Sequence, residues 1–238
     1  YVRKNKLEDR YYVSKAKDLV KDQSYVLWGL TQEALGRSVF PLAEYLKPEV
    51  RQFAADRQYD NLAKKAESYE ICFVPDNDYR GFLKRRVEGL EDEVKGGLFI
   101  DQSGSVLGYH DGYPFYTVGQ RKGLGKAFGK PMFVTDIIPE TNTVVLGEEM
   151  ELSRPAMDVS KLNWLKYNTV PGDEDFVTKV RYKDPGHVCQ VQHQGDELKI
   201  HFHAPVRGIA PGQSAVIYEG DDVVCGGIIR NSLFNFNH

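Results

Sequence analysis

Cys72 is the residue of this sequence best placed for nucleophilic chemistry. It lies in the segment 68–74 (Ser-Tyr-Glu-Ile-Cys-Phe-Val), after Lys64 and Lys65 and before a turn signal at 75–78 (Pro-Asp-Asn-Asp). Nearby cations favour the thiolate, which is the reactive form of cysteine. A lone cysteine between apolar residues is more often a buried core residue. From these residues alone both interpretations stay open, because a nucleophile also needs a partner in space.

A glycine-rich basic loop is the second chemical candidate. Residues 118–130 contain no acidic side chain, and they hold four cations and four glycines: Arg121, Lys122, Lys126, Lys130, Gly119, Gly123, Gly125 and Gly129. Such a loop lets backbone N–H groups and cations approach a phosphate together. The loop does not match the Walker pattern, so an ordinary solvated loop is the alternative.

A third candidate is a group of histidines near a cysteine. The group comprises His187, Cys189, His193, His201 and His203. His201 and His203 lie two apart on an expected strand and share a face, where they could ligate zinc. That face is also the polar side of the strand, and no compact four-ligand spacing is present. We therefore expect no metal site.

Composition narrows the class of protein. The chain has 238 residues, 41% hydrophobic and 27% charged, with a net charge of −3, so any nucleic-acid surface must be local. Three cysteines without paired spacing favour reduced thiols, and no apolar run or signal peptide indicates a membrane or export. We expect a cytoplasmic protein. The chain begins at Tyr1 without methionine, as a piece of a longer protein would.

The elements that must position these residues change character along the chain. Helices are expected over about 25–40, 48–59 and 79–87, the first with Asp22 or Ser24 as its N-cap. Beyond Gly96 the sequence turns to short strands broken by glycine and proline. The expected strands are 11–13, 99–101, 106–109, 115–118, 132–138, 143–146, 176–182, 198–203, 215–218 and 223–224. Those of the last 80 or so residues suggest a small barrel.

Several motifs together resemble one family, the tRNA-specific 2-thiouridylases. They are residues 21–25 (Lys-Asp-Gln-Ser-Tyr), 46–51, 68–73, 117–125 (Thr-Val-Gly-Gln-Arg-Lys-Gly-Leu-Gly), 211–215 and 225–229. Their order and spacing match throughout the chain. The resemblance implies an α+β multidomain fold with three parts. Residues 1–90 would be the helical end of an α/β nucleotide-binding domain, 91–157 a small β-rich central domain, and 158–238 a C-terminal antiparallel β-barrel.

The resemblance also implies a reaction, sulfur transfer to C2 of the wobble uridine of a tRNA anticodon. ATP, with Mg²⁺, would activate the C2 oxygen, and a persulfide on Cys72 would supply sulfur delivered by a carrier protein. The family's ATP loop (Ser-Gly-Gly-x-Asp-Ser) and first catalytic cysteine, which would form a disulfide as the product leaves, are absent from these 238 residues. We therefore expect the C-terminal two-thirds of such an enzyme. Here Tyr69 and Glu70 replace the family's Thr and Gly, and Glu70 disfavours a thiolate beside it.

The family's RNA contacts carry over to two groups of residues. By motif match the tRNA-binding residues are Lys21, Asp22, Gln23, Arg181, Tyr182 and Gln213. We add Arg121 and Lys122 from the basic loop, since cations suit phosphate contacts. Two other functions compete with the enzyme: a tRNA-binding module without catalysis, and a redox or metal-binding β protein that uses the histidines and cysteines.

Overall fold

The chain forms two compact units, and each is described by itself. The structure is a computed structural model that describes residues 1–64, 74, 78–171 and 174–233. Unit 1 combines Tyr1–Lys65 with Arg154–His238, and unit 2 is Ala66–Ser153. The three domain boundaries expected from the sequence remain a prediction. In the described part, no helix is long and apolar enough to cross a membrane.

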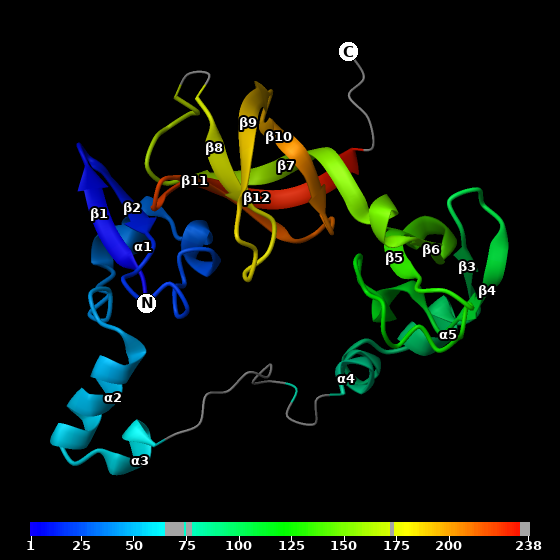
Figure 1. Ribbon diagram of the computed structural model, residues 1–238, viewed down its shortest axis with the longest axis horizontal. Coiled ribbons are helices and arrows are strands. Elements are labelled where there is room, and N and C mark those ends of the chain that lie inside the picture. Colours follow the sequence, from blue (N-terminus) through cyan, green and yellow to red (C-terminus); the bar gives the residue numbers. More distant parts are fainter. Residues whose placement is uncertain (65–73, 75–77, 172–173, 234–238) are drawn as a thin grey trace. The chain divides into compact units, whose positions relative to one another are not determined.

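A closed six-stranded antiparallel barrel forms the body of unit 1 (Figure 1). The sheet order β12-β11-β8-β9-β10-β7 closes through pairing of β12 with β7. The strands are β7 (Ser153–Trp164), β8 (Phe176–Lys179), β9 (His187–Gln194), β10 (Glu197–Arg207), β11 (Ser214–Glu219) and β12 (Asp222–Leu233). Buried aliphatic and aromatic side chains such as Leu198, Ile200 and Phe176 fill the interior. The expected α+β multidomain fold with a C-terminal barrel is confirmed.

The first forty residues cover the outside of this barrel. β1 (Arg3–Leu7) and β2 (Arg10–Ser14) form a hairpin, which joins the barrel sheet where Ser14 pairs with Asp222. Strand β11 is therefore buried on both faces: Ala215 and Ile217 point into the barrel, while Val216 and Tyr218 pack against the N-terminal segment. A strand that is covered on both faces has apolar side chains at successive positions, and residues 215–218 show this pattern.

A close backbone approach fixes the N-terminal segment on the barrel. Trp28 lies against Gly226 of β12, where an added Cβ would come within 2.6 Å of the Trp28 ring. The Trp28 Nε1–H donates to Ser214 Oγ at 3.0 Å, and the Asn163 amide donates to the Trp28 carbonyl at 2.6 Å. The buried hydroxyls of Ser24 and Tyr218 hydrogen bond at 3.0 Å.

The helix expected over 25–40 is two short helices. A 3-10 turn, η1 (Val26–Gly29), ends at Leu30, which has an extended backbone. Thr31 then accepts a hydrogen bond from the N–H of Ala34 and caps α1 (Gln32–Arg37), so the expected cap at Asp22 or Ser24 is wrong. The next helices are α2 (Lys47–Asp56) and α3 (Asp60–Ala63).

The described residues of unit 2 form a four-stranded sheet, two α-helices and three short 3-10 helices. The sheet order is β4-β3-β6-β5, with β3 and β6 parallel. Its elements are α4 (Tyr79–Arg86), α5 (Leu90–Val94), β3 (Gly97–Ile100), β4 (Val106–His110), η2 (Tyr113–Phe115), β5 (Phe133–Ile138), η3 (Pro139–Thr141), β6 (Thr143–Gly147) and η4 (Glu149–Leu152). The strand expected over 115–118 does not form, because Phe115 and Tyr116 turn into the core beside Phe99.

Candidate nucleic-acid interface

The loop that holds Lys21, Asp22 and Gln23 is built by two buried carboxylates. Asp18 accepts from the backbone N–H groups of Val20 at 3.1 Å and Lys47 at 2.8 Å. Asp22 accepts from the N–H of Ala16 at 3.0 Å and the hydroxyl of Ser24 at 2.6 Å. The Asp22 carboxylate therefore shapes the loop, and its RNA contact remains a prediction.

Tyr182 ties this loop to a turn of the barrel. Its hydroxyl donates to the carbonyl of Asp22 at 3.0 Å and accepts from the side-chain amide of Gln23 at 2.7 Å. The Tyr182 ring lies 6.3 Å from the ring of Tyr25. Two of the predicted segments, 159 residues apart along the chain, thus meet through direct hydrogen bonds.

Arg181 lies in this turn and not on a strand. The sequence predicted a strand to residue 182, but β8 ends at Lys179. The Asp184 carboxylate accepts the N–H of Val180 at 2.9 Å, and the N–H of Asp184 donates to the Arg181 carbonyl at 3.1 Å, so the chain leaves the ladder. Arg181 is exposed, and its guanidinium would be 3.2 Å from a Cβ added at Gly208.

Gln213 is exposed at the end of a tight turn before β11. The N–H of Gln213 donates to the carbonyl of Ala210 at 3.2 Å, and Gly212 supplies the φ of +86° that the turn requires. The next residue, Ser214, accepts the Tyr25 hydroxyl on its carbonyl at 2.8 Å. Tyr25 therefore contacts both Tyr182 and the residue after Gln213, and it links the predicted contacts of unit 1 to one another.

Known proteins resemble this chain along nearly its whole length. Three family models match in order: the tRNA methyl transferase HUP domain over residues 1–76, the tRNA methyl transferase PRC-barrel domain over 80–148, and the aminomethyltransferase beta-barrel domain over 154–229. A relative from Amoebophilus asiaticus, named tRNA-specific 2-thiouridylase MnmA, is 57% identical over 94% of this chain and 60% of its own length. Proteins of the same name from Cytophaga hutchinsonii and Salinibacter ruber are 53% and 52% identical, over 94% and 96% of this chain and 61% and 60% of their own lengths.

The chain belongs to the tRNA-specific 2-thiouridylase family. It spans about three fifths of the length of these relatives. The cysteine that the 2-thiouridylase resemblance assigns to catalysis, Cys72, lies outside the described residues, as do Tyr69 and Glu70.

The other two cysteines of the chain are buried in the barrel. Burial raises the pKa of the Cys189 thiol from 9.0 to about 11 and that of Cys225 to about 12. The Cys189 sulfur lies 3.1 Å from the Thr178 hydroxyl, a contact inside the core. Neither thiol is paired in a disulfide. Both are held as thiols at neutral pH, which is typical of structural cysteines.

Three of the four histidines that suggested a metal site have acidic or polar neighbours. His187 lies 2.9 Å from Asp184, His203 lies 3.0 Å from Asp175, and the His193 ring nitrogen lies 2.7 Å from the Thr169 hydroxyl. In the part of the chain with described coordinates, no group of three potential ligands lies close enough to hold a metal ion.

The glycine-rich loop of the family motif lies in unit 2, where the side chain of Gln120 shapes it. Gln120 accepts from the N–H of Thr117 at 3.1 Å and donates to the carbonyl of Lys122 at 2.9 Å. Arg121 and Lys122 are exposed, and the Arg121 guanidinium lies 5.9 Å from the centre of the Phe133 ring. Both cations are therefore accessible, and their contact with RNA remains a prediction.

This loop does not fit the triphosphate of ATP. A phosphate loop presents backbone N–H groups at the start of a helix. Here the N–H of Gly119 donates to the carbonyl of Val134 at 2.7 Å, and the loop leads into strand β5.

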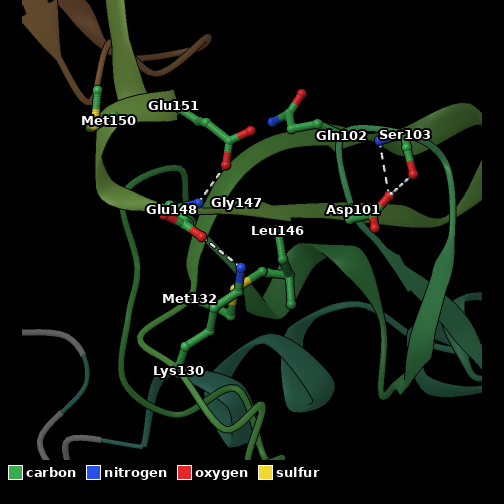
Figure 2. Close-up of a pocket in the computed structure, with 10 residues that line it drawn as sticks. All are labelled: Asp101, Gln102, Ser103, Lys130, Met132, Leu146, Gly147, Glu148, Met150 and Glu151. Carbon is green, nitrogen blue, oxygen red and sulfur yellow. Dashed lines mark hydrogen bonds and ion pairs between the residues drawn. The ribbon is translucent and has the colours of Figure 1, made fainter.

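Two further lysines of the loop have neighbours of their own. Lys126 donates to the carbonyl of Leu107 at 2.5 Å, and Lys130 pairs with Glu148 at 2.6 Å. Figure 2 shows the Lys130–Glu148 pair at the edge of a hollow of about 540 Å³, with Asp101 and Glu151 nearby. Three carboxylates to one ammonium make this hollow a poor place for an RNA backbone.

The sequence did not single out Asp18 or Tyr25, which position the predicted contacts. The signal for Asp18 was present, because acidic residues at 18 and 22 enclose a short segment in which the apolar pair Leu19–Val20 precedes Lys21. Asp and Asn commonly bond the backbone two or three residues ahead and so fix a turn. Tyr25 ends the matched motif at 21–25, but the motif does not indicate its partners, which come from far along the chain.

Proposed function

We propose that this chain is part of an enzyme that transfers sulfur to C2 of the wobble uridine in a tRNA anticodon. Two kinds of observation support the proposal. The relatives that share 52–57% of its residues are named tRNA-specific 2-thiouridylases. The observation that carries it furthest lies in unit 1, where Tyr182 hydrogen bonds to Asp22 and Gln23. Tyr25 in turn contacts both Tyr182 and Ser214, the residue after Gln213.

In the proposed reaction, Cys72 carries the sulfur as a persulfide received from a sulfur-carrier protein. The terminal sulfur attacks C2, and the activated oxygen leaves with its electron pair. A second cysteine thiolate then attacks the Cys72 sulfur, which breaks the S–S bond, leaves sulfur on C2 and joins the two cysteines as a disulfide. Cys189 and Cys225 are unsuited to that second role, because both are buried in the barrel. The second cysteine is therefore one outside these 238 residues.

ATP with Mg²⁺ is the proposed source of activation at the C2 oxygen, and no described residue is assigned to it. The proposed setting is the cytoplasm, where thiols stay reduced.

Replacement of Cys72 tests the catalytic part of the proposal. In the intact enzyme, Cys72→Ser should abolish 2-thiouridine formation, measured by mass spectrometry of digested tRNA. Cys189→Ser and Cys225→Ser serve as matched controls and should retain activity while lowering the thermal unfolding temperature, because each removes a buried sulfur from the core. Normal thiolation by the Cys72→Ser enzyme would refute the assignment.

A second function is favoured by the same geometry: this chain by itself as a tRNA-binding module without catalysis. The predicted contacts of unit 1 lie among the described residues, whereas the glycine-rich loop does not fit ATP. Binding of tRNA to the purified chain without thiolation would establish this role.

A further inference from the structure

The hollow beside Tyr182 is lined by two of the predicted RNA contacts, Asp22 and Tyr182, together with residues that have no predicted role. It has a volume of about 330 Å³, which is at the lower end of the range for ligand sites. Its lining comprises Leu19, Val20, Asp22, Lys179, Tyr182, Lys183 and Asp184, all in unit 1. Aliphatic, aromatic and cationic side chains thus surround one small depression.

Two neighbouring aliphatic side chains are held in solvent at its rim. Leu19 is 68% exposed and Val20 is 79% exposed. They occupy the tip of a turn in which the N–H of Lys21 donates to the carbonyl of Asp18 at 3.1 Å. Turn tips normally contain glycine, proline or small polar residues, so two adjacent apolar side chains at this position are unusual.

This exposure is fixed, because the turn is anchored from inside. The buried Asp18 carboxylate accepts from the N–H groups of Val20, Lys21 and, across the loop, Lys47. The apolar pair cannot turn inward without breaking these hydrogen bonds. Leu19 and Val20 therefore present a preformed apolar surface.

An aromatic ring stands on the other side of the hollow. Tyr182 is 38% exposed, and the two hydrogen bonds of its hydroxyl, to Asp22 and Gln23, fix the orientation of the ring. An oriented and partly exposed ring is a surface on which an unpaired base can stack.

The charge of the hollow suits a phosphate. Lys183 is exposed, and Lys179 lies on β8 with its ammonium 5.8 Å from the centre of the Tyr218 ring. The carboxylates of Asp22 and Asp184 also line the hollow, but both are buried. Their hydrogen bonds go to backbone N–H groups, the Ser24 hydroxyl and the His187 ring. The exposed charges of the lining are therefore positive.

We propose that this hollow binds one unpaired nucleotide of the RNA, with its base between the Leu19–Val20 pair and the Tyr182 ring and its phosphate near Lys183. The inference rests on the proposed function, because it names a nucleotide subsite within the proposed RNA surface. It adds Leu19, Val20 and Lys183 to the residues that contact RNA.

The test compares the chain with a double variant, Leu19→Ser with Val20→Ser. The probes are an RNA hairpin with an unpaired loop, the same hairpin with a single abasic site at each loop position in turn, and a fully paired duplex. Val39→Ser is the matched control, because Val39 is 82% exposed in unit 1 and lies outside this hollow. All the substituted side chains are exposed, and thermal unfolding checks that each variant remains folded.

We expect the double variant to bind the hairpin about five-fold more weakly or worse, as the loss of a base-stacking contact does. One abasic position should weaken binding to the wild-type chain by a similar factor and cause no further loss in the double variant. The duplex and the Val39→Ser variant should show no change. Lys183→Ala should lower the slope of log K against log salt by up to about one unit.

Three results would overturn the proposal, and they are distinguishable. Hairpin binding by the double variant equal to that of the wild type removes the subsite and leaves the proposed function standing. A loss in the double variant that adds to the loss at every abasic position means that no base occupies the hollow, as for a site that binds a protein. A wild-type chain that binds none of the RNAs removes both the subsite and the proposed RNA surface.

Discussion

Burial of the side chain sets the reactivity of the Cys189 and Cys225 thiols. Cys189 and Cys225 are buried, and burial raises their pKa values from 9.0 to about 11 and about 12. Since the thiolate is the reactive form, both should stay unmodified by iodoacetamide at pH 8 in the native chain and react once the chain is unfolded in denaturant. Mass mapping of the alkylated sites checks this, and rapid native labelling of Cys225 would contradict its burial.

The same pKa shifts make the free energy of unfolding depend on pH. A folded-state pKa above the unfolded value means that the folded chain keeps protons that the unfolded chain releases. The stabilisation is complete below pH 9.0, the ordinary value, and it is lost as pH rises through about 11 to 12. Alkaline unfolding in this window is thus expected to be shallower in a Cys189→Ala variant.

Arg181 and Gln213 should affect RNA binding in different ways. If the exposed guanidinium of Arg181 contacts a phosphate, Arg181→Ala will weaken tRNA binding and lower the salt slope of log K by up to about one unit. Gln213→Ala should weaken binding with almost no change in slope, because an amide carries no charge. Affinities measured across a salt series separate the two. An unchanged affinity and slope for Arg181→Ala would exclude this turn from the RNA surface.

At the scale of elements, the contact between η1 and β12 sets the position of the N-terminal segment on the barrel. Gly226→Ala places a Cβ within 2.6 Å of the Trp28 ring and should lower the free energy of unfolding by about 1–3 kcal/mol. Gly29→Ala is the control, because nothing lies within 4 Å of its added Cβ, and it should be neutral or raise stability by about 0.4–1 kcal/mol. Chemical denaturation measures both, and equal effects would contradict the close contact.

The sequence predicted strands well where the apolar pattern is local. Residues 106–109, 143–146 and 215–218 became β4, β6 and β11 with shifts of about one residue at their ends. The prediction was wrong where a polar side chain three or four residues away redirects the backbone. Asp184 ends β8 early, and Thr31 starts a new helix after η1.

The sequence predicted which residues belong to the candidate site, but it did not predict how they are arranged in space. Motif matching named Asp22, Gln23 and Tyr182, but no pattern indicates that the Tyr182 hydroxyl bonds to both of the others. These bonds join residues about 160 positions apart, and they follow from how the first forty residues lie on the barrel. The exposure of Leu19 and Val20 depends on the same packing and could not be predicted from composition.

At the scale of the whole molecule, RNA binding and ATP chemistry should be separable. The glycine-rich loop, which was the phosphate candidate of the sequence, has its Gly119 N–H bonded to Val134. The purified chain should therefore release no pyrophosphate from ATP and form no 2-thiouridine, with or without tRNA. A sensitive pyrophosphate assay with a complete family enzyme measured in parallel checks this. RNA-dependent release by the chain alone would refute it.

The hydroxyls of Ser24 and Tyr218 bond across 194 positions of sequence, and this has a consequence on the ribosome. At about 5–20 residues per second, translation separates the emergence of these two residues by about 10–40 seconds. During that interval the apolar side of the first forty residues has no barrel to cover it, since Val13, Tyr25 and Leu35 share a core with Val216 and Tyr218. Until Tyr218 has been synthesised, the nascent chain therefore exposes this apolar segment, which is the kind of surface that chaperones cover.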